Sequence, residues 1–248
     1  MRERAKSGAP IPNHLDGPSK SRDSASIADR RLEVTRLGFS SSLTSEQRAT
    51  LVGAMSDPDD RVRSGALGAI VRVGRTEIEQ TQIEQAWRVA HIDKNASVRR
   101  RASELAPKVA GIPIKLVIEL VVDSDPTVAE AAAWALGEMT GEHYPNEGAD
   151  LCDSTLENLA LSHKDALVRE ACVAALGARG VGLATILAAC SDKPAVRRRA
   201  ILALSPFEGP EVDAALASAL SDRDWQVRQA AEDLLGIDAA QLRENQED

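Results

Sequence analysis

Six segments of the chain share one spacing of hydrophobic and small residues. In each segment a valine is followed by alanine or cysteine four places later, and by apolar or small residues seven and eight places later. At about 100° per residue, these positions fall on one face of an α-helix. The pattern therefore predicts six amphipathic helices, whose first buried residues are Val62, Val98, Val128, Val168, Val196 and Val227.

Each predicted helix has a start signal and a second helical stretch before it. Three places before the valine, five of the six copies have aspartate or asparagine, whose side chains cap the free amides of a first helical turn. Lys193 is the exception and predicts a weaker cap. Seven places before the valine, five copies have an apolar residue, which predicts a buried position on the preceding helix. The repeating unit is therefore helix, tight turn and helix, with a period of about 30 residues.

Units of this length stack on their neighbours into an extended all-α array. We expect about six repeats over residues 45–237 and a capping helix within 25–41, which together form one domain over residues 25–248. Residues 1–24 are rich in Ser, Pro, Gly and charge, and this composition predicts a disordered N-terminal tail. Residues 140–153 lengthen one connection and are expected to form an insertion between two repeats.

The shared frame D-x-x-V-R-x-x-A-x-x-A-L resembles the bacterial HEAT-repeat proteins, especially the short-repeat kind first described in phycobilisome lyases. The resemblance covers about residues 45–236 and implies a right-handed α-solenoid of stacked helical hairpins. It indicates little about function, because such repeats serve as scaffolds, inhibitors, adaptors, DNA glycosylases and lyase subunits. Ala129 stands where the frame has arginine, so that repeat departs from the pattern.

The first arginine of the frame has an architectural explanation. It lies at the border of the buried face, where a guanidinium can reach a turn aspartate of its own or a neighbouring repeat. A stacked series of such pairs is what the resemblance implies, formed by Arg63, Arg99, Arg169, Arg197 and Arg228. The next arginines, Arg100 and Arg198, face away from the core. Arg101 and Arg199 stand where other copies have glycine or alanine, so their long side chains must extend outward along a neighbouring helix.

Composition narrows the function classes. The net charge of −8 makes the chain a poor electrostatic partner for a phosphate backbone, which disfavours nucleic acid. No apolar run reaches the roughly 18–20 residues that span a bilayer, so no membrane partner is expected. The N-terminus lacks the apolar centre of a signal peptide, and a cytoplasmic location is predicted.

Enzymatic chemistry has little support in the sequence. No H-E-x-x-H motif or paired His-Glu ligands occur, and His91 occupies a predicted buried position, so no metal or other cofactor is expected. The three cysteines form no C-x-x-C pair, and Cys152 is the only one expected to be exposed. A non-enzymatic role is favoured. Two alternatives stay open: a phycobilin-lyase-like or other catalytic accessory subunit, and, with less support, a HEAT-like DNA glycosylase, which should present aromatic residues on a broadly basic face.

A protein partner is therefore predicted, bound along the concave face that second helices usually form. Offsets 2, 5, 6 and 9 from the valine point away from the predicted core, and in the middle of the array several of these positions are apolar. We expect a partner-binding groove formed by Trp134, Val173, Ile201 and Leu202 and bordered by Arg100, Glu130, Glu170 and Arg198. Trp134 is the expected anchor. The alternative, that curvature buries these apolar residues between neighbouring helices, stays open, as does a binding site in the 140–153 insertion.

Overall fold

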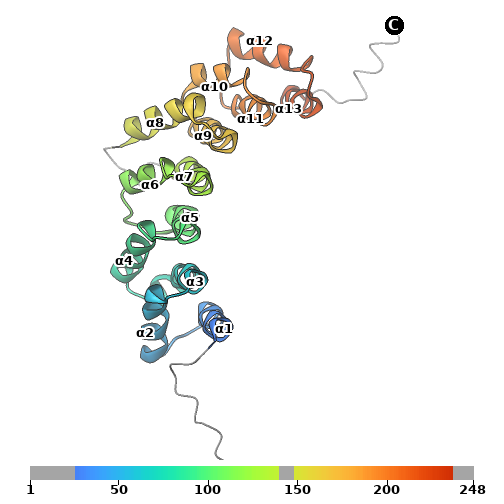
Figure 1. The fold of residues 1–248 in the computed structure, drawn as a ribbon. Coiled ribbons are helices and arrows are strands. Elements are labelled where there is room, and N and C mark those ends of the chain that lie inside the picture. The colour runs from blue at the N-terminus through green and yellow to red at the C-terminus, as the bar shows by residue number, and fades with distance from the viewer. Residues whose placement is uncertain (1–25, 140–147, 237–248) are drawn as a thin grey trace, which may run out of the picture.

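The computed structural model describes residues 26–139 and 148–236, and within them it contains thirteen α-helices, two short 3-10 helices and no strand. The predicted N-terminal tail lies outside the described residues, as do residues 140–147 of the predicted insertion. Figure 1 shows the helices stacked in pairs along a curved array. The predicted all-α solenoid is confirmed.

A single helix, α1 (Ile27–Gly38), precedes six pairs, in each of which a first helix is followed by a tight connection and a second helix. The 3-10 helices η2 (Ala54–Ser56) and η3 (Ala106–Lys108) extend α2 and α5. The six pairs are α2 (Ser45–Gly53) with α3 (Asp60–Glu77), α4 (Gln80–His91) with α5 (Ala96–Leu105), α6 (Ile114–Val121) with α7 (Pro126–Glu138), α8 (Ala149–Ser162) with α9 (Ala166–Arg179), α10 (Leu183–Ala189) with α11 (Pro194–Ala203), and α12 (Pro210–Ala219) with α13 (Trp225–Leu235).

The predicted caps are present at the start of the second helices. The side chains of Asp59, Asn95, Asp125, Asp165 and Asp224 each accept a hydrogen bond from the backbone N–H two residues later. Such a bond satisfies one of the amides that a helix leaves free in its first turn. Lys193 makes no side-chain cap, and Pro194 begins α11 instead. The predicted exception is also confirmed.

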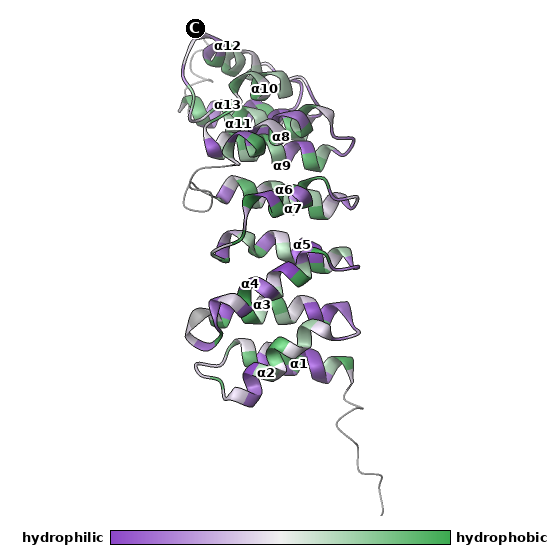
Figure 2. Cartoon of the chain, turned by 90° about the vertical axis from the view of Figure 1, so that its left-hand side faces the viewer, coloured by the Kyte–Doolittle hydropathy of each residue, from purple (hydrophilic) through white to green (hydrophobic). Residues whose placement is uncertain are grey.

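The second helices form a continuous inner layer. α1, α3, α5, α7, α9, α11 and α13 pack on one another in succession, and Figure 1 shows them on the inner side of the curve. A Cβ added at Gly177 in α9 would lie 2.6 Å from Cβ of Ala203 in α11, so this close approach requires glycine. The valines that define the repeat are all buried beneath this layer. Figure 2 shows hydrophobic and hydrophilic residues mixed along each helix, as amphipathic layers require.

The repeat that follows the predicted insertion departs from expectation in three ways. α8 begins at Ala149, so residues 149–153 are helical and do not belong to a loop. Cys152, expected to be exposed, is fully buried, because Cys152, Leu156 and Ala160 recur every four residues on the inner face of α8. Leu161, which stands seven places before Val168 at the position predicted to be buried, is 52% exposed, because Ala160 takes that place.

No helix among the residues that the structure describes is both long enough and apolar enough to cross a membrane.

Candidate functional site

Arginines of the second helices are paired with aspartates in the turn of the following repeat. Nε of Arg63 lies 2.7 Å from Oδ2 of Asp93, and both side chains are more than nine-tenths buried. The same pairing joins Arg99 with Asp123, Arg169 with Asp192, and Arg197 with Asp222. Arg30 of α1 extends the series to Asp57. We call these five pairs the ladder.

The four ladder arginines of the second helices each tie two turns together. Arg63 donates from Nε and Nη2 to the two carboxylate oxygens of Asp93, and from Nη1 to the backbone oxygens of Asp57 and Pro58 in its own turn. Oδ1 of Asp93 also accepts from the backbone N–H of Asn95. Such bidentate, charge-assisted bonds are shorter and stronger than neutral ones. Arg228, also predicted for this role, follows the last turn, and within the described chain it donates a hydrogen bond to the backbone oxygen of Asp222 and forms no ion pair.

The ladder changes the ionisation of its carboxyls. The hydrogen bond from Arg99 is the main cause that lowers the pKa of Asp123 below its ordinary value. Arg169 lowers the pKa of Asp192 and Arg197 lowers the pKa of Asp222 in the same way. The charged forms of these aspartates are therefore favoured in the folded protein.

The ladder is interrupted once, between α7 and α9. Ala129 occupies the position of the arginine, and His163 occupies the position of the aspartate in the following turn. Nδ1 of His163 accepts the backbone N–H of Asp165 at 3.1 Å, which is the bond that a turn aspartate accepts elsewhere. Both members of the pair are therefore replaced together, and the turn keeps its local geometry without the ion pair.

A different ion pair joins the elements around this interruption. Nη2 of Arg179, at the end of α9, lies 2.6 Å from Oδ1 of Asp153 in α8. Nη1 of Arg179 also faces the backbone oxygens of Leu136 and Met139 at the end of α7, at 3.4 and 3.5 Å. The side chain is 8% exposed. This pair has no counterpart in the repeat pattern, so the sequence periodicity gave no signal for it.

Two residues of the predicted groove lie in the core. Val173 is 0% and Ile201 is 2% exposed, so a partner cannot contact either of them. Gly177, one helical turn after Val173, lies against Ala203 of the next second helix, and residues four apart share a face. Offset 5 therefore points to the following repeat, and this part of the predicted patch is wrong. The alternative of burial between neighbouring helices holds for these two residues.

The remaining predicted residues lie at the surface to different degrees. Trp134 is 39% exposed. Arg100 is exposed and forms an ion pair with Glu104 at 3.2 Å, whereas Arg198, expected to face outward, is half-buried. Leu202, expected in the apolar patch, is half-buried and packs against the core.

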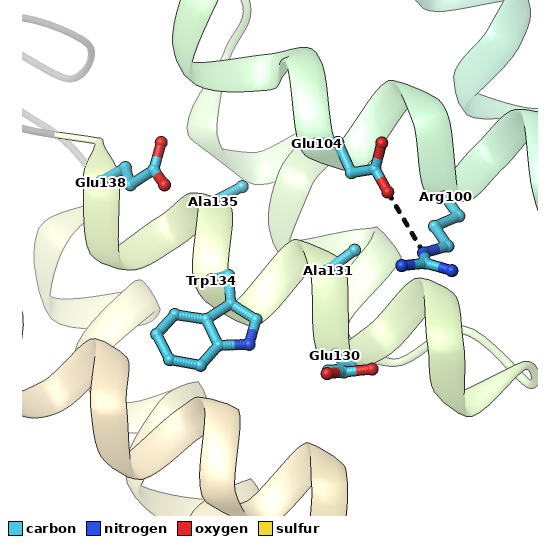
Figure 3. A pocket seen from close by; sticks show the side chains of 7 residues that line it. All are labelled: Arg100, Glu104, Glu130, Ala131, Trp134, Ala135 and Glu138. Atoms are coloured by element: carbon cyan, nitrogen blue, oxygen red, sulfur yellow. Dashed lines mark ion pairs between the residues drawn. The ribbon is translucent and has the colours of Figure 1, made fainter. Parts of the chain in front are cut away.

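A pocket of about 240 Å³ lies between α5 and α7 and contains the predicted anchor. Trp134, Glu130 and Glu138 come from α7, and Arg100 and Glu104 from α5 (Figure 3). In Figure 3 the indole ring projects away from Arg100 and Glu104. Four further lining residues were not in the predicted groove. Glu104 lies at offset 6, where the prediction selected only apolar residues, and Ala131, Ala135 and Glu138 lie at offsets 3, 7 and 10, which the predicted set of 2, 5, 6 and 9 leaves out.

One side of the tryptophan is covered by an arginine from a distant repeat. The guanidinium carbon of Arg199, in α11, lies 5.0 Å from the ring centroid of Trp134, in α7. Nη2 of Arg199 also lies 3.4 Å from Oε1 of Glu170 in α9, the helix between them. Glu170, predicted as a border residue, thus helps to position the arginine over the ring. The sequence predicted that Arg199 extends along a neighbouring helix, and this is confirmed.

His91 and two of the three cysteines, which were considered for enzymatic chemistry, are buried in the helical core. His91 is 8% exposed, stacks on the buried Trp87 and has its Nε2 3.0 Å from the backbone oxygen of Leu116. Burial raises the pKa of the Cys152 thiol to about 11 and that of Cys172 to about 12. Thiols with such pKa values are poor nucleophiles. Over residues 26–139 and 148–236, no group of three His, Cys, Asp or Glu side chains is placed to hold a metal ion.

Comparisons with known proteins agree on the fold. Residues 154–236 match the family model of HEAT repeats. The crystal structure of the Escherichia coli protein YibA is similar, with 13% identity, a TM-score of 0.58, and coverage of 88% of this chain and 77% of that chain. No curated protein matches the chain.

Two engineered proteins have lower TM-scores than YibA. One, described only as an engineered protein, has 17% identity, a TM-score of 0.48, and coverage of 75% of this chain and 94% of that chain. The other is a designed armadillo repeat protein in complex with the peptide (KR)4, with 14% identity, a TM-score of 0.43, and coverage of 84% and 90%.

Proposed function

We propose that this HEAT-repeat protein is a non-enzymatic scaffold or adaptor that binds a segment of a protein partner along the concave face of its solenoid. An extended inner layer of stacked second helices is the surface that such arrays use for binding. The predicted cytoplasmic location belongs to the same proposal.

The exposure of Trp134 is the observation that carries the proposal. Trp134 is 39% exposed and keeps apolar surface in water inside a pocket on the inner layer, whereas Trp87 is completely buried and the exposed Trp225 does not line this pocket. Tryptophan is enriched among the few interface residues that supply most of the binding energy. The neighbouring Glu130 and Glu138 favour a partner side chain that combines an apolar stem with a positive charge.

The test compares two tryptophans by affinity purification. Wild type, Trp134→Ala and Trp225→Ala are immobilised, and bound proteins are identified by mass spectrometry. Trp225 is a matched control, because it is 64% exposed and lies at the start of α13, outside the pocket. The partner is retained by wild type and by Trp225→Ala and lost from Trp134→Ala, and a peptide from it then binds wild type at least about thirtyfold more tightly than Trp134→Ala.

Three results would contradict the proposal. The first is a partner that Trp134→Ala retains fully. The second is a bilin that co-purifies with the chain and changes its absorption, which would favour the lyase-like alternative. The third is loss of binding only when residues 140–147 are shortened, which would move the site to the insertion.

A further inference from the structure

A second pocket on the inner layer has the opposite charge from the first. It has a volume of about 400 Å³ and spans α1, α3 and α5 at the N-terminal end of the array. No aspartate or glutamate is among the described residues that line it, although the whole chain has a net charge of −8. Four of the lining residues are arginines, namely Arg31, Arg61, Arg72 and Arg101. We call it the arginine pocket.

Two of these arginines have no carboxylate partner among the described residues. Arg31 is exposed on α1 and takes part in no ion pair of the described chain. Arg72 lies over the ring of the exposed Phe39, with its guanidinium carbon 4.4 Å from the ring centroid. The other two form ion pairs with carboxylates that do not line the pocket, Arg61 with Asp59 at 2.8 Å and Arg101 with Glu104 at 3.0 Å. The pocket therefore keeps positive charge that no carboxylate of the described chain compensates.

The backbone of α3 is adapted to hold Arg101 in this position. Gly68 faces the pocket, and a Cβ added there would lie 2.8 Å from Nη2 of Arg101. Corresponding positions in the other repeats have larger side chains, including Trp134. Glycine at this place lets the guanidinium lie across α3, where it adds to the charge supplied by α1 and α3. The hydroxyl of Ser64 lines the same pocket and can donate a further hydrogen bond, whereas those of Thr35 and Ser97 already donate to the backbone oxygen of Arg31 and to Oδ2 of Asp60.

We propose that the arginine pocket binds the carboxylates of an acidic protein segment. Forked guanidinium donors match carboxylates bidentately, and the Ser64 hydroxyl adds one more donor. The inference rests on the proposed function, because it names the part of the same partner segment that lies at this end of the concave face. α3 and α7 are two helix steps apart, roughly 16–20 Å at the usual interaxial distance. About five or six extended residues therefore separate the acidic part of the segment from the residue at Trp134.

The test uses a probe whose binding should not depend on Trp134. Fluorescein-labelled hexaglutamate is titrated with the full chain at low salt, and its fluorescence anisotropy is measured. We expect saturable binding that weakens as salt is added and that falls roughly tenfold in Arg31→Ala/Arg72→Ala. Gly68→Ala should also weaken binding, because the added methyl displaces Arg101. The control Lys115→Ala/Arg223→Ala removes two exposed charges outside the pocket and should leave binding unchanged.

The outcomes separate this inference from the proposed function. Absence of hexaglutamate binding, or equal loss in the pocket and control variants, overturns the acidic-segment proposal and leaves the Trp134 proposal standing. An oligothymidylate that binds more tightly than hexaglutamate with the same arginine dependence overturns it in favour of a nucleic acid. Loss of binding in Trp134→Ala would show that the probe occupies the central pocket, which also overturns it. Circular dichroism of every variant checks that the helices are retained.

Discussion

The guanidinium of Arg199 lies over the indole ring of Trp134, with its carbon 5.0 Å from the ring centroid, although α9 lies between their two helices. This contact joins repeats that are not neighbours along the solenoid. Nε of Arg199 is buried without a hydrogen-bond partner among the described residues, so the stack and the ion pair with Glu170 must offset that cost.

A double-mutant cycle measures this contact. Arg199→Ala and Trp134→Ala should each lower the free energy of unfolding, and the double variant should lose less than their sum by ~0.5–1 kcal/mol, the usual energy of a partly exposed cation–π contact. Urea unfolding followed by circular dichroism gives the energies. Strict additivity would mean that the two side chains do not interact in solution.

The ladder predicts a contrast between an inner and a terminal arginine. Arg63→Ala leaves the buried carboxylate of Asp93 without its partner, and we expect a loss of ~3–5 kcal/mol in the free energy of unfolding. Arg228→Ala removes a bond to one backbone oxygen only and should cost ~1 kcal/mol. Urea unfolding of both variants checks this order, and an equal cost would show that the ion pair contributes little.

Acid should weaken the ladder. The pKa values of Asp123, Asp192 and Asp222 are lowered in the folded protein, chiefly by hydrogen bonds from arginine, from an ordinary value of 3.8. Their contribution to stability is therefore present above about pH 4 and is lost as the pH falls through the folded pKa values. The urea midpoint should fall between about pH 5 and about pH 3, and by less in Asp222→Asn, which lacks one of these carboxylates. Parallel curves for the two proteins would contradict this assignment.

The parts of the fold that were predicted from sequence are those set by local spacing. The buried valines and the caps at Asp59, Asn95 and Asp125 depend on residues within one or two helical turns, so one helix is enough to identify them. Val173 and Ile201 were misplaced because a second helix has neighbours on both sides, and the period of a single helix does not show which flank the next repeat covers. The stack of Arg199 on Trp134 depends on the curvature of three helices together, which no spacing encodes.

The interruption of the ladder provides the last test. Ala129 and His163 occupy the two positions that an arginine and an aspartate occupy elsewhere, and the turn keeps its backbone hydrogen bond through Nδ1 of His163. The turn at His163 therefore keeps the hydrogen bond of the other turns, and we expect an arginine–aspartate pair introduced at these two positions to form. His163→Asp alone creates a carboxylate without its arginine, and Ala129→Arg alone places a guanidinium at a fully buried position, so each should destabilise the protein.

The double variant Ala129→Arg/His163→Asp should be more stable than the sum of the two single effects by ~1–3 kcal/mol, because the introduced arginine gains a bidentate carboxylate and the backbone oxygen of the turn before it. The control Ala129→Lys/His163→Asp should show a smaller coupling, since an ammonium group cannot make the forked contact. Urea unfolding of these four variants and of Ala129→Lys alone gives both coupling energies. Additive effects in the arginine cycle would mean that the turn at His163 is displaced from the ladder position.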